Sequence, residues 1–188
     1  YRRALSRLQD NVEPFPLTEV EILIQQELDT RTSQAFATFE PVPIAAASLA
    51  QVHRAELRDG RPVVVKVQRP GVRRQVLGDL EVLEEIVGTI DSYTSLGHQY
   101  AFQAMFDSFR TSLLHELDYR REVRNMVRLR HDLQAYEGIH VPRPVPDYST
   151  SRLLTMEYVA GVAVSNLGPL ARLELDGYGY YGYWKTPE

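Results

Sequence analysis

The sequence of 188 residues contains no cysteine, and this absence excludes several kinds of site at once. Disulfide bonds, thiolate nucleophiles and cysteine-ligated zinc or iron–sulfur centres all require that side chain. The sequence also lacks an apolar run of about 18 residues, the length that crosses a bilayer. No secretory signal pattern follows Tyr1, and the start without methionine suggests an excerpt from a longer protein. The sequence therefore predicts no transmembrane segment in this chain.

An excess of basic charge is missing as well. Lysine and arginine number 21 against 25 aspartates and glutamates, which gives a net charge of −4 and argues against a general nucleic-acid-binding protein. Arginines cluster within 69–74 and 120–124, but acidic residues are interleaved with both clusters, which favours solvated helix faces. A hydrophobic content of 44% is that of an ordinary globular domain, and wholesale disorder is excluded.

Helical and strand patterns alternate along the chain and predict the fold class. Helices are expected at residues 2–10, at 18–28 behind a Thr18/Glu21 capping box, near 76–90 and at roughly 101–133. Strands are expected at 48–57, 62–68 and 152–159, with a turn at Asp59-Gly60, a polar linker at 91–100 and an extended segment at 141–146. This order predicts an α+β fold in which helices pack on a small antiparallel sheet.

The five histidines show no metal-ligand spacing, and no Ser-His-Asp or paired-carboxylate arrangement can be argued from the sequence. His53 is expected to be structural rather than catalytic. No catalytic residue and no metal ligand is therefore assigned in this chain.

The order of four features matches a kinase-type nucleotide site. Such a site needs a loop over the phosphates, a strand lysine for the α- and β-phosphates, a helical glutamate that holds the lysine and a hinge strand that meets the adenine. The candidates here are residues 45–48, Lys66, the acids of the long helix and residues 155–159. Alternation of the strand places Val65 and Val67 on the face opposite Lys66. A lone lysine on a strand is usually a solvated surface residue without a binding role. The order of the four features along this chain favours a binding role for Lys66.

Two stretches carry a specific resemblance: PIAAASLAQVHRAELRDGRPVVVKVQRPGV at 43–72 and HELDYRREVRNM at 115–126. They resemble the UbiB/AarF family of atypical protein-kinase-like proteins, also called the ADCK group, over about residues 8–167. That family has an alanine-rich AAAS loop, a V-K-V-Q-x-P-G-V lysine strand and an E-x-D motif. The resemblance implies a protein-kinase-like N-lobe whose catalytic C-lobe is absent from this chain.

The resemblance also implies a set of nucleotide-binding residues. It assigns phosphate contacts to Lys66, lysine pairing to Glu122 and the acidic motif beside the nucleotide to Glu116 and Asp118. The remaining implied contacts are the loop residues Ala45, Ala46, Ala47 and Ser48 and the adenine-binding hinge residues Glu157, Tyr158 and Val159. The implied cofactor is ATP with Mg²⁺, and the ligands of the ion are expected mostly in the missing lobe.

Helix geometry raises a question about the acidic motif. At about 100° per residue, Asp118 and Glu122 share a stripe of one helix, whereas Glu116 lies about 160° from Asp118. Either the helix is interrupted near 116–118, or Glu116 serves a different contact. The resemblance suggests the second alternative, because a Lys-x-Gly-Gln motif that would lie upstream of Tyr1 packs against this region in the family.

Alanine in place of glycine changes what the loop can do. Glycine adopts positive φ readily, whereas alanine resists it by about 1 kcal/mol or more. A stiffer loop is therefore expected, with the Ser48 hydroxyl free to donate. This favours ATPase or small-molecule chemistry over protein phosphorylation, and the resemblance implies ATP-dependent support of isoprenoid-quinone (ubiquinone or plastoquinone) metabolism.

Motifs of a second lobe are not found after Val159: neither an H-x-D-x-H-P-G-N-like loop nor a D-F-G-like motif is present. We expect a helical extension at 1–40, the nucleotide-binding lobe at 41–167 and an irregular Gly/Tyr-rich tail at 168–188, with no catalysis by this chain alone. The rival interpretation is a non-catalytic, truncated pseudokinase-like interaction module. The resemblance implies nucleotide, membrane, lipid or quinone-pathway partners, no nucleic acid, and a cytoplasmic membrane face or an organelle.

Overall fold

The computed structural model describes residues 12–93, 102–136 and 138–161. Contacts divide the chain into one unit that ends at Glu157 and a second that begins at Tyr158. The helix predicted at 2–10 and the tail predicted at 168–188 lie outside the described residues.

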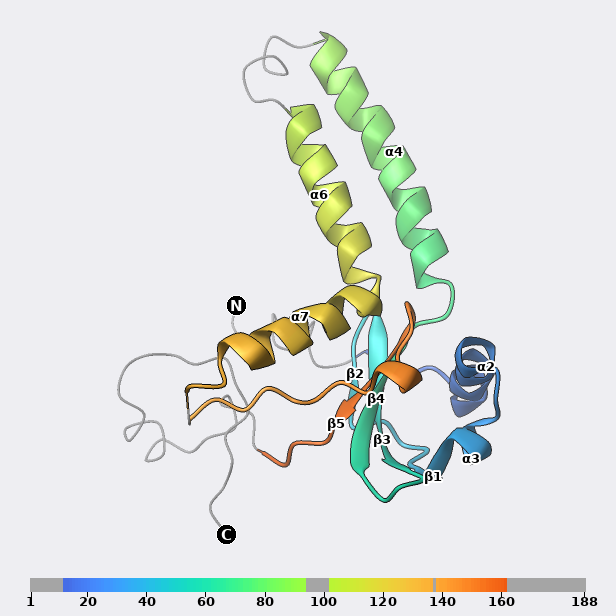
Figure 1. Cartoon of the computed structure of the whole chain (residues 1–188). Coiled ribbons are helices and arrows are strands. Elements are labelled where there is room, and N and C mark those ends of the chain that lie inside the picture. The colour runs from blue at the N-terminus through green and yellow to red at the C-terminus, as the bar shows by residue number, and fades with distance from the viewer. Residues whose placement is uncertain (1–11, 94–101, 137, 162–188) are drawn as a thin grey trace, which may run out of the picture. The chain divides into compact units, whose positions relative to one another are not determined.

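The first unit contains the helices and strands labelled in Figure 1. In chain order they are α2 (Leu17–Leu28), α3 (Thr32–Ala35), β1 (Phe36–Phe39), β2 (Ala45–Ala46), β3 (Ala50–Leu57), β4 (Pro62–Gln68), α4 (Val72–Tyr93), α6 (Phe102–Glu116), α7 (Tyr119–Asp132), the 3-10 helix η1 (Pro146–Tyr148) and β5 (Leu153–Glu157). The predicted α+β class, a small antiparallel sheet with packed helices, is confirmed.

The sheet has the order β1-β3-β4-β5, with β2 paired to β3, and every pairing is antiparallel. The turn between β3 and β4 needs glycine, since Gly60 has φ +86°. Asp59 accepts a hydrogen bond from the Arg61 amide through its side chain, at 3.1 Å. The predicted hairpin is therefore present, and it sets the register of the two longest strands.

One face of the sheet packs against α2 and forms the main core. Val63, Val65 and Val67 alternate along β4 and are almost fully buried. Val20 and Ile24 of α2 lie in the same cluster, because i and i+4 residues share one face of a helix. Burial of each such side chain contributes about 1.5–3 kcal/mol. The predicted placement of Val65 and Val67 opposite Lys66 is confirmed.

The start of α2 differs from the prediction. The helix begins at Leu17, and its cap residue Pro16 makes no side-chain cap bond. The Pro16 carbonyl instead accepts from the amides of Glu19 and Val20, at 3.0 and 3.3 Å. Thr18 therefore lies inside the first turn, and the predicted capping box is wrong because the preceding proline carbonyl starts the helix.

Helix α4 extends to Tyr93, so the polar linker predicted at 91–100 begins too early. The predicted boundary at residue 40 falls between β1 and β2 of one sheet, and α2 contributes to the core beneath that sheet. The boundary predicted at residue 167 lies outside the described residues.

A buried polar network ties the segment before α2 to the sheet. Gln51 accepts from the Phe15 amide at 3.0 Å and donates to the Phe15 carbonyl at 3.3 Å. Its amide nitrogen also lies 2.9 Å from Nε2 of His53, whose Nδ1 lies 2.8 Å from the Glu40 carbonyl oxygen. Because the amide nitrogen of Gln51 is a donor, His53 has to accept at Nε2 and donate at Nδ1. The network thus holds His53 in one neutral tautomer, stacked on Phe39.

This network predicts that stability falls as the pH drops. Burial lowers the pKa of His53 below its ordinary 6.5, although its hydrogen bond to the Glu40 carbonyl acts in the opposite direction. Below pH 6.5 the unfolded chain therefore binds a proton that the folded chain does not, and the free energy of unfolding decreases by at most about 1.4 kcal/mol per pH unit. Urea unfolding at pH 7.5 and 5.5 measures this effect.

The His53→Gln variant should show a smaller stability difference between the two pH values than the parent chain. His115→Gln is the matched control, because His115 is exposed on α6. If the pH dependence is the same in the parent chain and in His53→Gln, the buried histidine is not its source.

Candidate nucleotide-binding site

Strand register places the alanine segment and the lysine in one row across the sheet. Ala45 pairs with Val52, Val52 with Lys66 and Lys66 with Leu154. Residues directly opposite each other point to the same face, and neighbouring strands lie about 4.8 Å apart. The row therefore lies on the face opposite the main core, and α7 contacts β5 on this side.

Lys66 and Glu122 form an ion pair although 56 residues separate them in the sequence. Nζ of Lys66 lies 2.8 Å from Oε2 and 3.2 Å from Oε1 of Glu122. The side chains are 28% and 39% exposed, so water screens their attraction and the pair adds little stability. The predicted pairing is observed, and its partly open position leaves the ammonium within reach of an anionic ligand.

Tyr119 completes the surroundings of the lysine. Its ring centroid lies 4.7 Å from Nζ of Lys66, within the range of a cation–π contact. The residue is 3% exposed and packs with Ala50 and Leu154. Burial raises the pKa of Tyr119, and the nearby carboxylates of Glu122 and Glu116 raise it further. The phenol is therefore neutral near pH 7 and forms a fixed wall beside the ammonium.

The long helix predicted at 101–133 is wrong, because the structure has two helices separated at Leu117 and Asp118. Leu117 is buried, and its carbonyl accepts from Nε2 of Gln68 at 3.0 Å. The Tyr119 amide donates to the Ser151 carbonyl at 3.1 Å rather than continuing the α6 hydrogen-bond ladder. Contacts on both sides of the break, to β4 and to the segment before β5, therefore fix where α7 begins.

The break answers the question about the acidic motif. Glu116 is the last residue of α6 and is exposed, whereas Asp118 is the N-cap of α7. Of the two alternatives left open by the sequence, the interruption is present. A nucleotide contact of either acid stays a prediction.

Asp118 has a local structural role that the sequence reading missed. Its side chain accepts from the Arg120 amide at 3.1 Å and so satisfies one of the amides left free at the helix start. Glu122 lies in the first turn and Arg130 in the last, which matches the helix dipole. Aspartate is a poor helix-interior residue and a good N-cap, and this signal could have located the start of α7.

Replacing Asp118 by alanine is expected to lower the free energy of unfolding by about 1 kcal/mol, the usual cost of a lost N-cap. Asp118→Asn keeps a side-chain acceptor and should recover most of the loss. Urea unfolding followed by circular dichroism measures both variants. Equal stability of Asp118→Ala and the parent chain would contradict the capping role.

The alanine segment is only partly a loop. Ala45 and Ala46 form β2, and the Ala47 amide donates to the Ala50 carbonyl at 2.7 Å. None of the residues 45–48 has a positive φ, so alanine is accommodated without strain. Ser48 is exposed, and its hydroxyl makes no hydrogen bond to the described residues. The prediction of a four-residue loop is therefore corrected to a short strand followed by a tight turn.

The predicted hinge is placed only in part. Glu157 ends β5, and its carboxylate accepts from the Arg143 amide at 3.1 Å and contacts Nε2 of His140 at 3.2 Å. Its side chain therefore bonds to the segment before η1. Tyr158 and Val159 follow the strand and belong to the second unit. The strand predicted at 152–159 is shorter, ending at Glu157.

The donor set fits the phosphates of ATP better than it fits a metal ion. Lys66 offers a partly exposed ammonium, and the exposed Ser48 hydroxyl lies on the turn after the strand that pairs with β3. Over the described ranges, no three His, Cys, Asp or Glu side chains are grouped so that they could hold a metal ion. Within these ranges the side chains therefore form no preassembled metal site.

Comparison with known proteins decides the family. The family described as the ABC1 atypical kinase-like domain matches residues 7–177. The chain belongs to the ABC1 family. The resemblance to UbiB/AarF proteins is thereby confirmed, and the antiparallel sheet with packed helices is an α+β kinase-like N-lobe.

Several ABC1 relatives are similar over most of this chain. An uncharacterized Mycobacterium tuberculosis protein, Rv0647c, is 39% identical over 93% of this chain and 36% of its own length. A probable protein kinase UbiB of Cellvibrio japonicus is 34% identical over 92% of this chain and 31% of its own. The chloroplast protein Activity of bc1 complex kinase 7 of Arabidopsis thaliana is 40% identical over 89% of this chain and 24% of its own.

A solved structure supports the ABC1 fold. The complex of Rv3197 with erythromycin from Mycobacterium tuberculosis is 30% identical, with a TM-score of 0.63 over 88% of this chain and 40% of that chain. The chain thus spans well under half the length of these ABC1 relatives. Among the helices that the structure describes, none is both long and apolar enough to cross a bilayer.

Proposed function

We propose that this chain is the ATP-binding lobe of a UbiB/AarF-like atypical kinase or ATPase. The observation that carries the proposal is the Lys66–Glu122 pair, whose Nζ–Oε2 distance is 2.8 Å, in the same cross-strand row as Ala45. Lys66 binds phosphate oxygens, and Glu122 holds the ammonium in the orientation that this contact needs.

The remaining residues of the proposed site have supporting roles. Ser48 donates its hydroxyl to a phosphate from the turn of the alanine segment, and Ala45, Ala46 and Ala47 form its wall. Glu116 and Asp118 border the site from the break between α6 and α7. The adenine is proposed to meet the backbone at Glu157, Tyr158 and Val159. No residue in the described ranges is assigned as the general base that orients the attacking nucleophile. We therefore expect nucleotide binding without phosphoryl transfer.

The biological role is proposed from family membership. We infer that the complete protein uses ATP to support isoprenoid-quinone metabolism, that is, ubiquinone or plastoquinone. Its partners would be membrane, lipid or quinone-pathway proteins, on the cytoplasmic face of a membrane or inside an organelle. The relatives named for UbiB and for bc1 complex kinase activity support this choice.

Calorimetric titration of the chain with Mg-ATP tests the proposed binding function. A single saturable site is expected, and its loss in Lys66→Ala would locate it. No saturable heat in the parent chain, or equal affinity in the variant, would contradict the proposal.

A second candidate is a non-catalytic interaction module. Helices α4 and α6 lie side by side (Figure 1). The Arg110 guanidinium on α6 and the Glu84 carboxylate on α4 form an ion pair at 3.0 Å. Large apolar side chains are exposed on both helices: Val82, Leu83, Ile86, Met105 and Phe109. These side chains favour contact with a partner. Stable binding of a quinone-pathway protein together with no binding of ATP would favour this candidate.

A further inference from the structure

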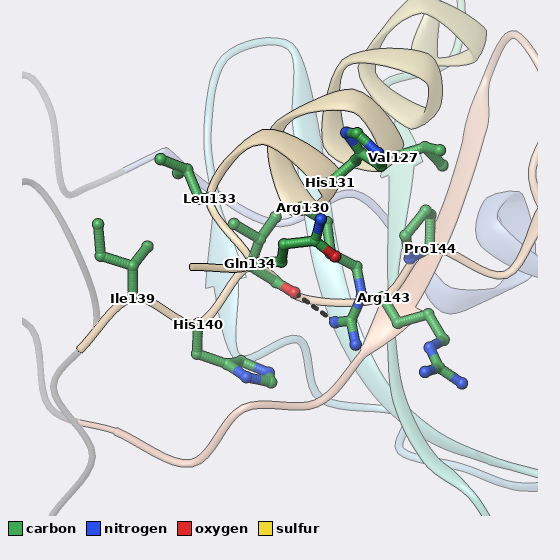
Figure 2. Close-up of a pocket in the computed structure, with 10 residues that line it drawn as sticks. Val127, Arg130, His131, Leu133, Gln134, Ile139, His140, Arg143 and Pro144 are labelled. Atoms are coloured by element: carbon green, nitrogen blue, oxygen red, sulfur yellow. Dashed lines mark hydrogen bonds between the residues drawn. The ribbon is translucent and has the colours of Figure 1, made fainter. Parts of the chain in front are cut away.

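A pocket of about 490 Å³ lies between the C-terminal half of α7 and the segment 139–144. Figure 2 shows Arg130 reaching from α7 toward the chain segment that carries Arg143 and Pro144. The pocket has the volume of a small-molecule site. None of the residues assigned to the nucleotide site lines it.

The pocket has two arginines and no carboxylate in its lining. Nη1 of Arg130 donates to the Val141 carbonyl at 3.0 Å, and the rest of its guanidinium has no partner among the described residues. The Arg143 guanidinium has no hydrogen bond or ion pair to any described residue. The carboxylates bonded to lining residues are those of Asp132, beside His131, and Glu157, beside His140. Arg143 is exposed, and its guanidinium, together with the rest of the Arg130 guanidinium, can donate to an anionic ligand group.

The rest of the lining is mixed. Val127, Leu133, Ile139, Val141 and Pro144 contribute aliphatic surface, and His131, Gln134 and His140 contribute polar side chains. No phenylalanine, tyrosine or tryptophan lines the pocket. A chain of methylene groups gains by leaving water for the aliphatic surface.

We propose that this pocket binds a small amphiphilic anion, an aliphatic chain with one carboxylate or phosphate group, and that its binding strengthens nucleotide binding. The coupling rests on the proposed function. Helix α7 carries Glu122 at one end and Arg130 at the other, and the 139–144 segment bonds Glu157 through His140 and the Arg143 amide. A bound anion would link α7 to the 139–144 segment and so restrict the motion of both. Less conformational entropy would then be lost when ATP binds.

Dodecanoate, kept below its micelle concentration, is the probe for calorimetric titration of the 188-residue chain. A single saturable site is expected. Arg143→Gln should weaken binding by at least about tenfold, because it removes a charged donor. The Arg130→Gln/Arg143→Gln double variant should bind more weakly still. Arg124→Gln removes an exposed arginine of α7 that does not line the pocket and should bind like the parent chain.

Dodecanol, which keeps the chain and lacks the charge, should bind much more weakly than dodecanoate. Equal affinity of the parent chain and Arg143→Gln would overturn the site. Binding to anionic vesicles without saturable binding of monomeric dodecanoate would also overturn it, in favour of a membrane surface.

The coupling is measured by titrating Mg-ATP with and without saturating dodecanoate. The affinity should rise at least about fivefold, and dodecanoate affinity should rise by the same factor when ATP is present. An unchanged or weaker ATP affinity would overturn the coupling. Absence of ATP binding would contradict the proposed function instead, because the dodecanoate titration and its arginine variants remain readable without nucleotide.

Discussion

Replacing Lys66 by alanine is expected to weaken Mg-ATP binding by at least about 30-fold, which corresponds to about 2 kcal/mol or more. The variant removes the ammonium that would contact the phosphates and leaves Glu122 without the partner that it holds at 2.8 Å. An unpaired carboxylate beside a phosphate adds repulsion to the lost attraction. Isothermal titration calorimetry at fixed salt measures the difference.

Lys66→Met separates the charge from the packing, since it keeps an apolar stem over Tyr119. It should lose nearly as much affinity as the alanine variant. Arg73→Ala is the charge control, because Arg73 is exposed on α4. Glu122→Gln should weaken binding less than either lysine variant, and the double variant should show that the two losses are not additive. Full affinity in Lys66→Met would remove this lysine from the site.

The hairpin and its lysine could be predicted from the sequence because their signals are local. Alternation of valines around Lys66 gives the buried face, and Asp59-Gly60 gives the turn. Once both are fixed, the register follows, and it places Val52 opposite Lys66. Identifying Glu122 as the partner needed more than periodicity, since the two residues lie on different elements. That pairing came from the family resemblance.

The break before α7 could not be predicted from helix periodicity, because long-range contacts produce it. Gln68 lies 49 residues from Leu117, whose carbonyl it bonds. The apolar spacing of the segment suits one long helix, and these sheet contacts override it. The Thr18 capping pattern failed for a local reason instead, because the helix begins at Leu17 and the Pro16 carbonyl accepts from the amides of Glu19 and Val20.

The break has a consequence for the lysine site. In a kinase-like lobe, the helix that carries the glutamate has to be in place for the lysine to be oriented. Here the residue before the N-cap of α7, Leu117, is bonded to β4 through Gln68, the Tyr119 amide donates to Ser151 in the segment before β5, and Tyr119 is buried beside Lys66. The Lys66–Glu122 pair is therefore held by contacts within the lobe itself.

Replacing Phe36 by alanine is expected to cost about 3–5 kcal/mol of folding free energy, a large part of the 5–15 kcal/mol typical of a domain. Phe36 is 1% exposed, and its ring centroid lies 5.6 Å from those of Phe39 and Tyr148. Removing the ring leaves a cavity in the cluster that joins β1 to α2. Urea unfolding followed by circular dichroism measures the loss, seen as a lower midpoint at unchanged slope.

Phe109→Ala makes the same chemical change on α6, where the ring is 50% exposed, and should cost less than about 1 kcal/mol. Equal losses in the two variants would contradict a core centred on Phe36.

Phe36 pairs with Leu57 on the face opposite Lys66, so the folded Phe36→Ala chain should keep its ATP affinity. Lys66→Met should show the reverse, with lost affinity and a stability change of about 1 kcal/mol or less, because its ion pair is screened by water. Stability and nucleotide affinity therefore depend on opposite faces of one sheet, and these two variants change them separately.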